Sequence, residues 1–284
     1  MCRVGFHFCR EPVECLAFYQ LNSGVCVAKV TAVGETEELK SMPGAIDSSK
    51  LVTSALRIDE EMKMEDFKKL CNGTVFDAGN FDKCTYVEGE LHSEGDVPAV
   101  VSQDGSRKEW HSRGQCYRAY GPRKIYTTPY CLDAEWMQKP NNYHRENGPS
   151  VIYINSVRAE LQYWKDGRIH NPRGPARIVW EAGTNEDDHF YEDRREHFLD
   201  GSLCVKSCVG EEDPSSEFNT ERFTKLLNEA VESKEGFIEA MRKHFKRWTD
   251  PAQDRPTALV PIQVEEEKKS DSGQVTDTAP ISTV

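Results

Sequence analysis

Long hydrophobic runs are absent from this chain of 284 residues. No apolar stretch approaches the roughly 20 residues of a membrane-spanning helix, and the N-terminus lacks the apolar core of a signal peptide. Hydrophobic residues make up only 37% of the chain, against 30% charged residues. This balance favours an elongated body with a disordered end over a compact enzyme. We therefore expect an intracellular protein that is not secreted and has no membrane span.

Positive charge is also scarce. The chain has 36 Lys and Arg against 48 Asp and Glu, a formal net charge of -12. Clustered Lys and Arg hold the phosphates of nucleic acids, so this acidic balance argues against nucleic-acid binding. The ten cysteines include no Cys-x-x-Cys pair. Without an export signal we interpret them as reduced and structural, with a zinc site or disulfides as alternatives.

What the sequence does contain is a repeat. Glycines at 95, 121, 148, 174 and 201 follow one another at steps of 26, 27, 26 and 27 residues. The two clearest copies surround Gly148-Pro149 and Gly174-Pro175, and each has His four residues before the glycine and Ile four residues after it. So regular a period indicates a repeat array, which we place in five units over residues 76–209.

Each unit is predicted to be one β-hairpin. Tyr163-Trp164 ends a strand, and Asp166-Gly167 forms a tight turn in which Gly167 tolerates positive φ. The return strand passes through His170, loosens towards Gly174 and resumes after Pro175, which cannot donate to a strand ladder. A single hairpin cannot bury its aromatic face, so neighbouring units stack into one elongated antiparallel sheet.

The array resembles the MORN-type hairpin repeat, in a longer variant with His followed by Gly-Pro that recurs in large DNA viruses and phages. The residues that carry the resemblance best are Tyr163-Trp164, Asp166-Gly167, His170, Gly174-Pro175 and Ile178. The resemblance implies a viral protein located in the host-cell cytoplasm or the virion. The first unit departs from the pattern by inserting Asp96-Val97. The last has Arg194 where the turn glycine is expected, as degenerate terminal units would.

Residues 1–75 are predicted to form a small α+β domain. We expect a buried strand at residues 5–9, a helix at 12–19 and a central strand at 25–33. A further strand at 51–58 and a short helix at 62–70 complete it. The motif Gly5-Phe-His-Phe-Cys9, with the sequence that follows it, resembles an uncharacterised domain of tailed phages and large DNA viruses. That resemblance implies no activity.

Residues 215–248 change to helical periodicity, with apolar residues every three or four positions from Phe223 to Trp248. Asn219 or Thr220 is predicted to cap the start, and Gly236 to divide the run into a helix pair. We expect the apolar residues of this stretch to cap the exposed edge of the last hairpin, because open edges invite aggregation. They are Phe223, Leu227, Phe237 and Met241.

Residues 249–284 are predicted to be a disordered tail that is dispensable for folding, because they cannot bury enough apolar surface to offset the ordering entropy. The predicted fold class is therefore α+β. It combines a small N-terminal domain, an elongated antiparallel hairpin sheet, a C-terminal helix or helix pair, and a tail.

The candidate interaction residues occupy repeated positions in the array. They are Trp110, Trp136, His144, Gly148, Trp164, Gly167, His170, Gly174 and His197. A ladder formed by the histidines, with His92, could bind a metal or a polyanion. Tyr117 at the aligned place is a poor zinc ligand, which favours a structural role. An aromatic column of these tryptophans with Tyr86 and Tyr191 could stack bases or sugars, but cross-strand packing is favoured.

Two other groups invite a chemical interpretation. His7 and Cys9 would face the same side of a strand and could form a nucleophilic pair, although no orienting Asn or Asp lies nearby. Cys204 and Cys208 with His197 offer three metal ligands but no evident fourth. We favour structural roles for both groups, and we assign no catalytic, metal-binding or cofactor-binding residue.

These observations favour a non-enzymatic protein whose hairpin-repeat surface binds another protein, viral or host. The oligomeric state stays open. The alternative is an enzyme of unknown reaction in the N-terminal domain, with the array as its targeting arm. A concave pocket that holds His7 or Cys9 beside an acidic residue such as Glu14 would favour this alternative.

Overall fold

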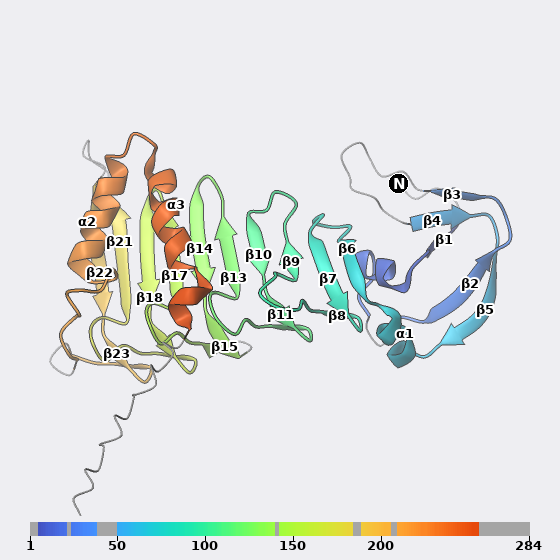
Figure 1. The fold of residues 1–284 in the computed structure, drawn as a ribbon, viewed down its shortest axis with the longest axis horizontal. Helices are drawn as coiled ribbons and strands as arrows, with labels where there is room; N and C mark the ends of the chain where they lie inside the picture. Colours follow the sequence, from blue (N-terminus) through green and yellow to red (C-terminus); the bar gives the residue numbers. More distant parts are fainter. Residues whose placement is uncertain are drawn as a thin grey trace, which may run out of the picture.

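The computed structural model describes residues 5–21, 24–38, 50–139, 142–183, 189–205 and 209–255. They form an elongated body, with the N-terminal domain at one end, a long antiparallel sheet beside it, and two helices across the sheet at the other end (Figure 1). The predicted α+β class is confirmed.

The N-terminal domain contains two small sheets and two short helices. Its elements are β1 (Phe6–Cys9), η1 (Pro12–Ala17), β2 (Val27–Ala32), β3 (Thr36–Glu38), β4 (Lys50–Thr53), β5 (Leu56–Met62) and α1 (Met64–Leu70). One sheet has the order β1-β4-β3, and β2 pairs with β5 in a separate ribbon. The strand expected to be central therefore has a single partner. The helix expected at 12–19 is a 3-10 helix, η1.

The long sheet has eleven strands, and every neighbouring pair is antiparallel. From the C-terminal edge they are β22 (Phe190–Glu196), β21 (Arg177–Ala182), β18 (Arg158–Gln162), β17 (Val151–Asn155), β14 (Cys131–Glu135), β13 (Lys124–Thr127), β10 (Arg107–Glu109), β9 (Val100–Val101), β7 (Lys83–Val87) and β6 (Gly73–Phe76), with β8 (Glu90–Leu91) on β7. The boundary expected between residues 75 and 76 falls inside β6. Val75 of that strand packs with Val13 and Phe67 of the N-terminal domain.

The turns differ from the prediction in one respect. Asp166–Gly167 does form a tight turn, with φ of 49° and 77°, but it joins the short strands β19 (Trp164–Lys165) and β20 (Arg168–Ile169) outside the long sheet. The long strands β17 and β18 are joined at the opposite end by residues 156–157. There the Asn155 side chain accepts hydrogen bonds from the backbone N–H groups of Val157 and Arg158, at 3.0 and 2.7 Å. This Asx turn is the signal that identifies the hairpin.

Units along the array therefore combine two long strands with a short hairpin along one border of the sheet. The other short hairpins are β11 (His111–Ser112) with β12 (Gln115–Cys116), β15 (Met137–Lys139) with β16 (Asn142–Tyr143), and β23 (Phe198–Leu199) with β24 (Ser202–Leu203). At the array's N-terminal end, the end of β7 forms the equivalent hairpin with β8.

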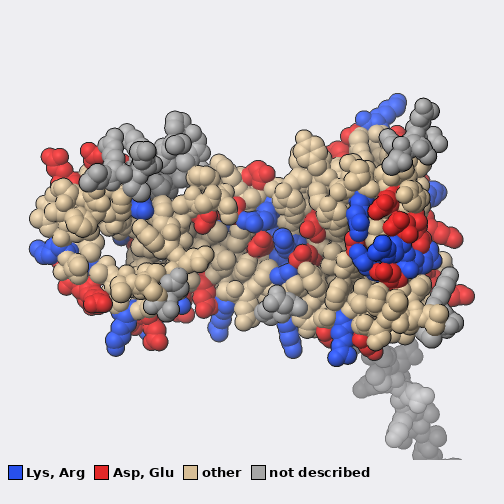
Figure 2. Space-filling view, turned by 180° about the vertical axis from the view of Figure 1, so that it is seen from behind, with Lys and Arg blue, Asp and Glu red and all other residues tan. Residues whose placement is uncertain are grey.

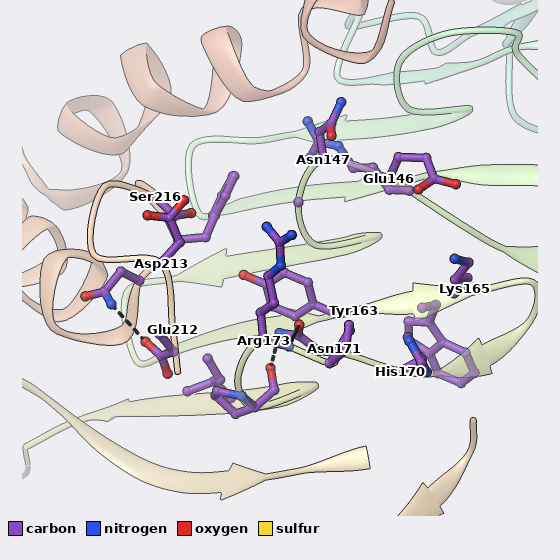
Figure 3. Close-up of a pocket in the computed structure, with 18 residues that line it drawn as sticks. Glu146, Asn147, Tyr163, Lys165, His170, Asn171, Arg173, Glu212, Asp213 and Ser216 are labelled. Carbon is purple, nitrogen blue, oxygen red and sulfur yellow. Dashed lines mark hydrogen bonds between the residues drawn. The ribbon is translucent and has the colours of Figure 1, made fainter. Parts of the chain in front are cut away.

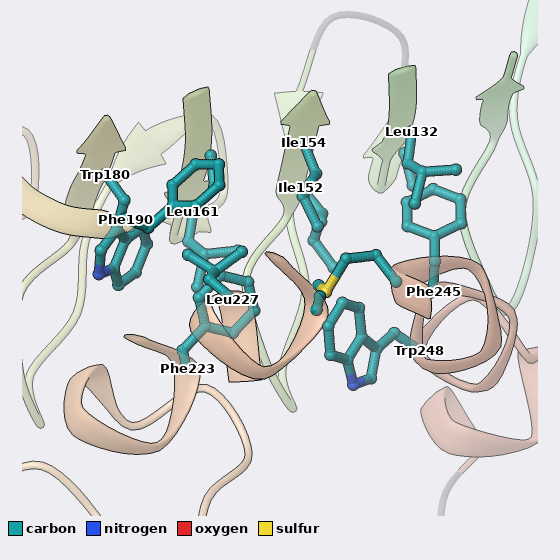
Figure 4. Close-up of a cluster of buried hydrophobic side chains, with 14 of the residues drawn as sticks. Leu132, Ile152, Ile154, Leu161, Trp180, Phe190, Phe223, Leu227, Phe245 and Trp248 are labelled. Carbon is teal, nitrogen blue, oxygen red and sulfur yellow. The ribbon is translucent and has the colours of Figure 1, made fainter. Parts of the chain in front are cut away.

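Helices α2 (Thr220–Val231) and α3 (Phe237–Trp248) cover a face of the long sheet. They also contact the edge strand β22, as expected: Phe237 stacks on Phe190, and Asn228 accepts from the Phe190 N–H at 2.7 Å and donates to its carbonyl at 3.3 Å. In Figure 4, Leu132, Ile154, Leu161 and Trp180 point from successive strands towards the helices. Strand alternation places Ile152, Ile154 and Leu161 on this one face, where they need an apolar partner. The rest of the edge strand β22, Glu192-Asp-Arg-Arg-Glu196, is charged, which protects that part of the edge from aggregation.

The expected helix signals operate as predicted. Asn219 caps α2 by accepting from the backbone N–H of Arg222, and Gly236, with φ of 86°, separates the two helices. Among the described residues no helix is long and apolar enough to cross a membrane.

The tail predicted from residue 249 starts too early. Residues 251–254 form the 3-10 helix η3 (Pro251–Asp254), and the Asp254 carboxylate accepts hydrogen bonds from Trp136 Nε1 at 2.7 Å and Arg145 Nε at 2.9 Å. Polar composition misled the prediction, because a single carboxylate here neutralises a buried guanidinium. Residues 256–284 lie outside the described residues.

Candidate functional site

The repeated histidines connect adjacent units. His92, His144 and His170 each accept a hydrogen bond at Nδ1 from the backbone N–H of the first turn residue in the next short hairpin, namely Arg113, Asp166 and Asp200. The distances are 3.2, 3.2 and 3.0 Å. Each histidine satisfies a backbone donor that a left-handed turn leaves open, so these histidines have a structural role, as the repeat position suggested.

The last unit is out of register with the alignment made from the sequence. Gly201 was grouped with the Gly-Pro glycines, but Asp200–Gly201 is a turn with φ of 50° and 83°, equivalent to Asp166–Gly167. The His197 carbonyl accepts from the Cys204 N–H as the Tyr163 carbonyl accepts from the His170 N–H. His197 therefore occupies the place of Tyr163, and the expected turn glycine is Gly201. The connection 183–189 between β21 and β22 makes this unit longer. The glycine spacing in the sequence therefore aligned Gly201 with the Gly-Pro glycines instead of with the turn glycine Gly167.

The predicted aromatic column is in fact two sets of residues. Trp110, Trp136 and Tyr163 are equivalent, because each carbonyl accepts from the residue that follows the short hairpin. Trp164 lies one position later and pairs with Ile169 across the hairpin. Since a shift of one residue turns a side chain to the opposite face, the tryptophans do not form one stacking surface. Trp110 and Trp136 are buried.

At each of three Gly-Pro loops, a side chain four residues before the proline donates a hydrogen bond to the proline carbonyl. This contact was not predicted from the sequence. Arg145 donates from Nη1 to the Pro149 carbonyl at 3.3 Å, and its guanidinium lies 3.9 Å from the centre of the Trp136 ring. Arg118 does the same with Pro122, and Asn171 donates to Pro175. The spacing of four residues between each donor and its proline was the available signal. Gly148 and Gly174 lie in these loops, where positive φ favours glycine.

Three predicted site residues, Gly148, Trp164 and His170, come together around a cavity of about 490 Å³ (Figure 3). Glu212, one of its charged groups, is already engaged. Glu212 accepts from Thr220 N–H at 2.8 Å, Thr220 Oγ1 at 2.7 Å and Asn219 Nδ2 at 3.1 Å. Burial, and then the Glu212 charge, raise the pKa of the Tyr163 hydroxyl. The Glu212 hydrogen bonds join the segment before α2 to the start of that helix, and the Gly210 N–H joins the same segment to the array by donating to the Pro172 carbonyl at 2.8 Å. We therefore interpret the residues around this cavity as a structural contact.

The face of the sheet opposite the helices, here called the open face, is polar. Its middle row, followed across the strand register, consists of Tyr126, Asp133, Tyr153, Glu160 and Val179. Figure 2 shows this side, with basic and acidic residues crowded together over the β18 to β22 end. There Glu160 accepts from Arg177 Nε at 2.7 Å, Gln162 Nε2 at 2.7 Å and Arg158 Nη2 at 2.8 Å. The charges at this end are mutually satisfied.

Asp133 occupies the equivalent position on β14 but lacks such partners. It lies between Tyr126 and Tyr153, and none of the described residues forms an ion pair or a side-chain hydrogen bond with its carboxylate. Burial, followed by repulsion from Glu135, raises the pKa of Asp133 to about 6. Lys124 opposes this shift but does not cancel it, so the open face carries a largely desolvated carboxylate without an ion-pair partner among the described residues.

Replacing Asp133 with Asn should stabilise the fold at neutral pH. The pKa of this carboxyl rises from 3.8 to about 6 on folding, so the folded state binds the proton more tightly than the unfolded state does. Ionisation then costs stability as the pH rises from about 4 to about 6, and the cost is complete above that range. The upper limit is about 3 kcal/mol, and we expect about 1–2 kcal/mol after solvent screening.

Urea unfolding at pH 4 and at pH 7.5 checks this result, with a gain expected only at pH 7.5. Asp104→Asn is a control of opposite sign, because hydrogen bonds from Ser102 and Ser106 lower the pKa of Asp104 to about 2. Equal effects of Asp133→Asn at both pH values would contradict the argument.

A second cavity lies in the N-terminal domain. It measures about 710 Å³, and His7, Cys9, Cys15 and Phe67 are among the residues that line it. A hydrogen bond from the Cys9 thiol lowers the pKa of Cys15. The carboxylate of Glu14 instead accepts from the backbone N–H groups of Arg10 and Glu11, both at 2.9 Å, and so does not orient an imidazole. His7 and Cys9 share this pocket with Glu11 and Glu60, but Glu14, the acidic residue that the enzymatic alternative named, is not among the residues that line it. Cys208 of the proposed Cys204–Cys208 metal pair lies outside the described residues.

The fold and these sites define an antiparallel β-hairpin sheet with helices on one face. Residues 1–70 match the family model described as Domain of unknown function (DUF7666). The matched segment extends from the N-terminus to the end of α1. No curated protein and no solved structure matches the chain.

Proposed function

We propose that this chain is a non-catalytic protein with MORN-like repeats, whose open face binds a partner protein through a Lys or Arg side chain placed on Asp133. The observation that carries the proposal is the contrast between Asp133 and Glu160. The two carboxylates occupy equivalent positions in one row, but Glu160 is paired with two arginines of the chain, whereas Asp133 forms no ion pair with any described residue.

The surroundings of Asp133 support a protein partner. Asp133 lies between Tyr126, which is 37% exposed, and Tyr153 in the strand register, so aromatic residues flank the carboxylate. Protein interfaces are enriched in tyrosine and arginine, and desolvated charge pairs at their centre favour specific binding. The net charge of -12 favours a basic partner segment and disfavours nucleic acid. The viral setting, in the host-cell cytoplasm or the virion, rests on the resemblance of the repeats and the N-terminal motif.

Two variants that remove the same charge test the proposal. Asp133→Asn removes the open-face carboxylate, and Glu229→Gln removes an exposed carboxylate from α2. With a photo-crosslinking residue at Tyr126, the full chain should form a discrete adduct in infected cells. We expect Asp133→Asn to abolish the adduct, although it stabilises the fold, and Glu229→Gln to retain it. Loss in both variants, or in neither, would contradict the proposal.

A specific observation also favours a second candidate, a thiol-dependent activity of the N-terminal domain. The cavity beside η1 brings His7, Cys9 and Cys15 together, and the thiolate is the reactive form of cysteine. The array would then be a targeting arm. Binding through the open face and chemistry in this cavity use different parts of the chain, so each can be tested by itself.

Replacing Cys9 with Ala should slow the alkylation of Cys15 several-fold at neutral pH. The Cys9 thiol lowers the pKa of Cys15 by donating a hydrogen bond to it, so without Cys9 a smaller fraction of Cys15 is thiolate. Mass spectrometry of iodoacetamide-treated protein gives the rate for each cysteine. Exposed Cys26 is the internal control and should react at an unchanged rate. An unchanged rate at Cys15 would remove the support for thiol chemistry.

A further inference from the structure

One short hairpin differs from the others in the residues of its cross-strand pair. In four hairpins this pair is apolar or aromatic: Tyr86 with Leu91, Met137 with Tyr143, Trp164 with Ile169, and Phe198 with Leu203. In the β11–β12 hairpin the same two positions hold His111 and Cys116. Packing explains an apolar pair at this place, but it does not explain an imidazole opposite a thiol.

A third metal-ligating group completes the cluster. Glu109, at the end of β10, places Oε2 3.2 Å from His111 Nε2. The ligand atoms of Glu109, His111 and Cys116 all lie within 4.8 Å of one another. Two atoms bound to one zinc ion are separated by at most the sum of their bond lengths, about 4.4 Å for nitrogen and sulfur. Small side-chain movements therefore suffice to bring all three groups onto one ion.

The His111 side chain is only 11% exposed, and its Nε2 atom is the nitrogen that faces Glu109. An ion bound at Nε2 would therefore be largely shielded from bulk water. His111 also lines a cavity of about 360 Å³ with Trp110 and Tyr117.

The three groups together suit a cation. The Glu109 carboxylate and the Cys116 thiol can both carry negative charge, and they flank the His111 imidazole.

We propose that Glu109, His111 and Cys116 form a zinc-binding site with one open coordination position. Sulfur, nitrogen and oxygen donors together suit Zn²⁺, and three protein ligands leave a fourth tetrahedral position for water or for a donor from a partner. On binding, the Cys116 thiol releases its proton to solvent and the ion replaces any proton on His111, so no oxidant or reductant is required. The site is independent of the open-face partner.

Cobalt titration of the full-length chain tests the proposal, after treatment with a chelator. Co²⁺ should bind with a stoichiometry of one and produce thiolate-to-cobalt charge-transfer absorption, which Zn²⁺ should then abolish by displacement. Cys116→Ser should lack this absorption. Cys131→Ser, which removes a half-buried cysteine on β14, should retain it. Absence of the absorption in the wild-type chain, or its persistence in Cys116→Ser, overturns the proposal.

A double variant separates metal binding from folding. His111→Trp with Cys116→Ile introduces the pair that Trp164 and Ile169 form two units later, so the hairpin should fold without a metal. Saturating Zn²⁺ should raise the melting temperature of the wild-type chain and leave that of the double variant unchanged, because a ligand stabilises only the state that binds it. Equal zinc-induced shifts in the two proteins would contradict a site at these residues.

Discussion

Replacing Asp254 with Ala should destabilise the fold by about 3–5 kcal/mol, the cost of leaving one partner of a buried ion pair alone. The partner is Arg145, whose side chain is 3% exposed and stacks on Trp136. Burial disfavours the charged guanidinium and lowers its pKa, an effect that the Asp254 carboxylate opposes. The same carboxylate accepts from Trp136 Nε1, so the variant orphans two buried donors. Urea unfolding followed by circular dichroism measures the loss.

The neighbouring unit supplies a matched control. Asp96 contacts Arg118, which stacks on Trp110 in the same geometry, but the side chain of Asp96 is 50% exposed. Arg118 is itself only 7% exposed, so Asp96→Ala should have a cost, but a smaller one than Asp254→Ala because water reaches the Asp96 side of the pair. A chain that ends at Arg255 should be as stable as the full chain, and one that ends at Asp250 should be as weak as Asp254→Ala. Similar losses for Asp96→Ala and Asp254→Ala would show that the burial of the pair is unimportant.

The second large effect is expected at the contact between α2 and the sheet. Phe223 is fully buried, and its ring centre lies 4.9 Å from that of Trp180 on β21. Phe223→Ala should lower the free energy of unfolding by about 3–5 kcal/mol, because it removes apolar contact and leaves a cavity. Urea unfolding again gives the value.

Leu203→Ala is the control, since Leu203 is 70% exposed and its replacement should change stability by less than about 0.5 kcal/mol. A chain truncated after Asp213 extends the same test, because it lacks both helices. It should bind a hydrophobic dye and self-associate through the uncovered Ile152, Leu161 and Trp180. A stable monomer that binds no dye would mean that the sheet does not need the helices.

The sequence was sufficient for the features that depend on local chemistry. The helix cap at Asn219, the break at Gly236 and the turn at Asp166–Gly167 each need only a few adjacent residues, and each is present. The repeat period likewise predicted an antiparallel array. The choice of which turn joins the long strands failed, because the Asx turn at Asn155 resembles ordinary strand sequence.

Features that depend on distant residues could not be found in this way. Asp254 lies 109 residues from Arg145, and nothing in the polar sequence near Asp254 announces a buried partner. The apolar stripe of α2 and α3 indicated a partner surface but did not distinguish a sheet edge from a sheet face. Asp133 and the group of Glu109, His111 and Cys116 became visible only when equivalent positions could be compared in the correct register.

The contacts of His92, His144 and His170 each join one unit only to the next. The number of units therefore determines the length of the array. One extra unit between β10 and β13 would add two strands and increase the separation of the N-terminal domain from the helices by about 10 Å. Neither end would need new contacts, so a change of spacing between two bound molecules requires only a change in the number of copies.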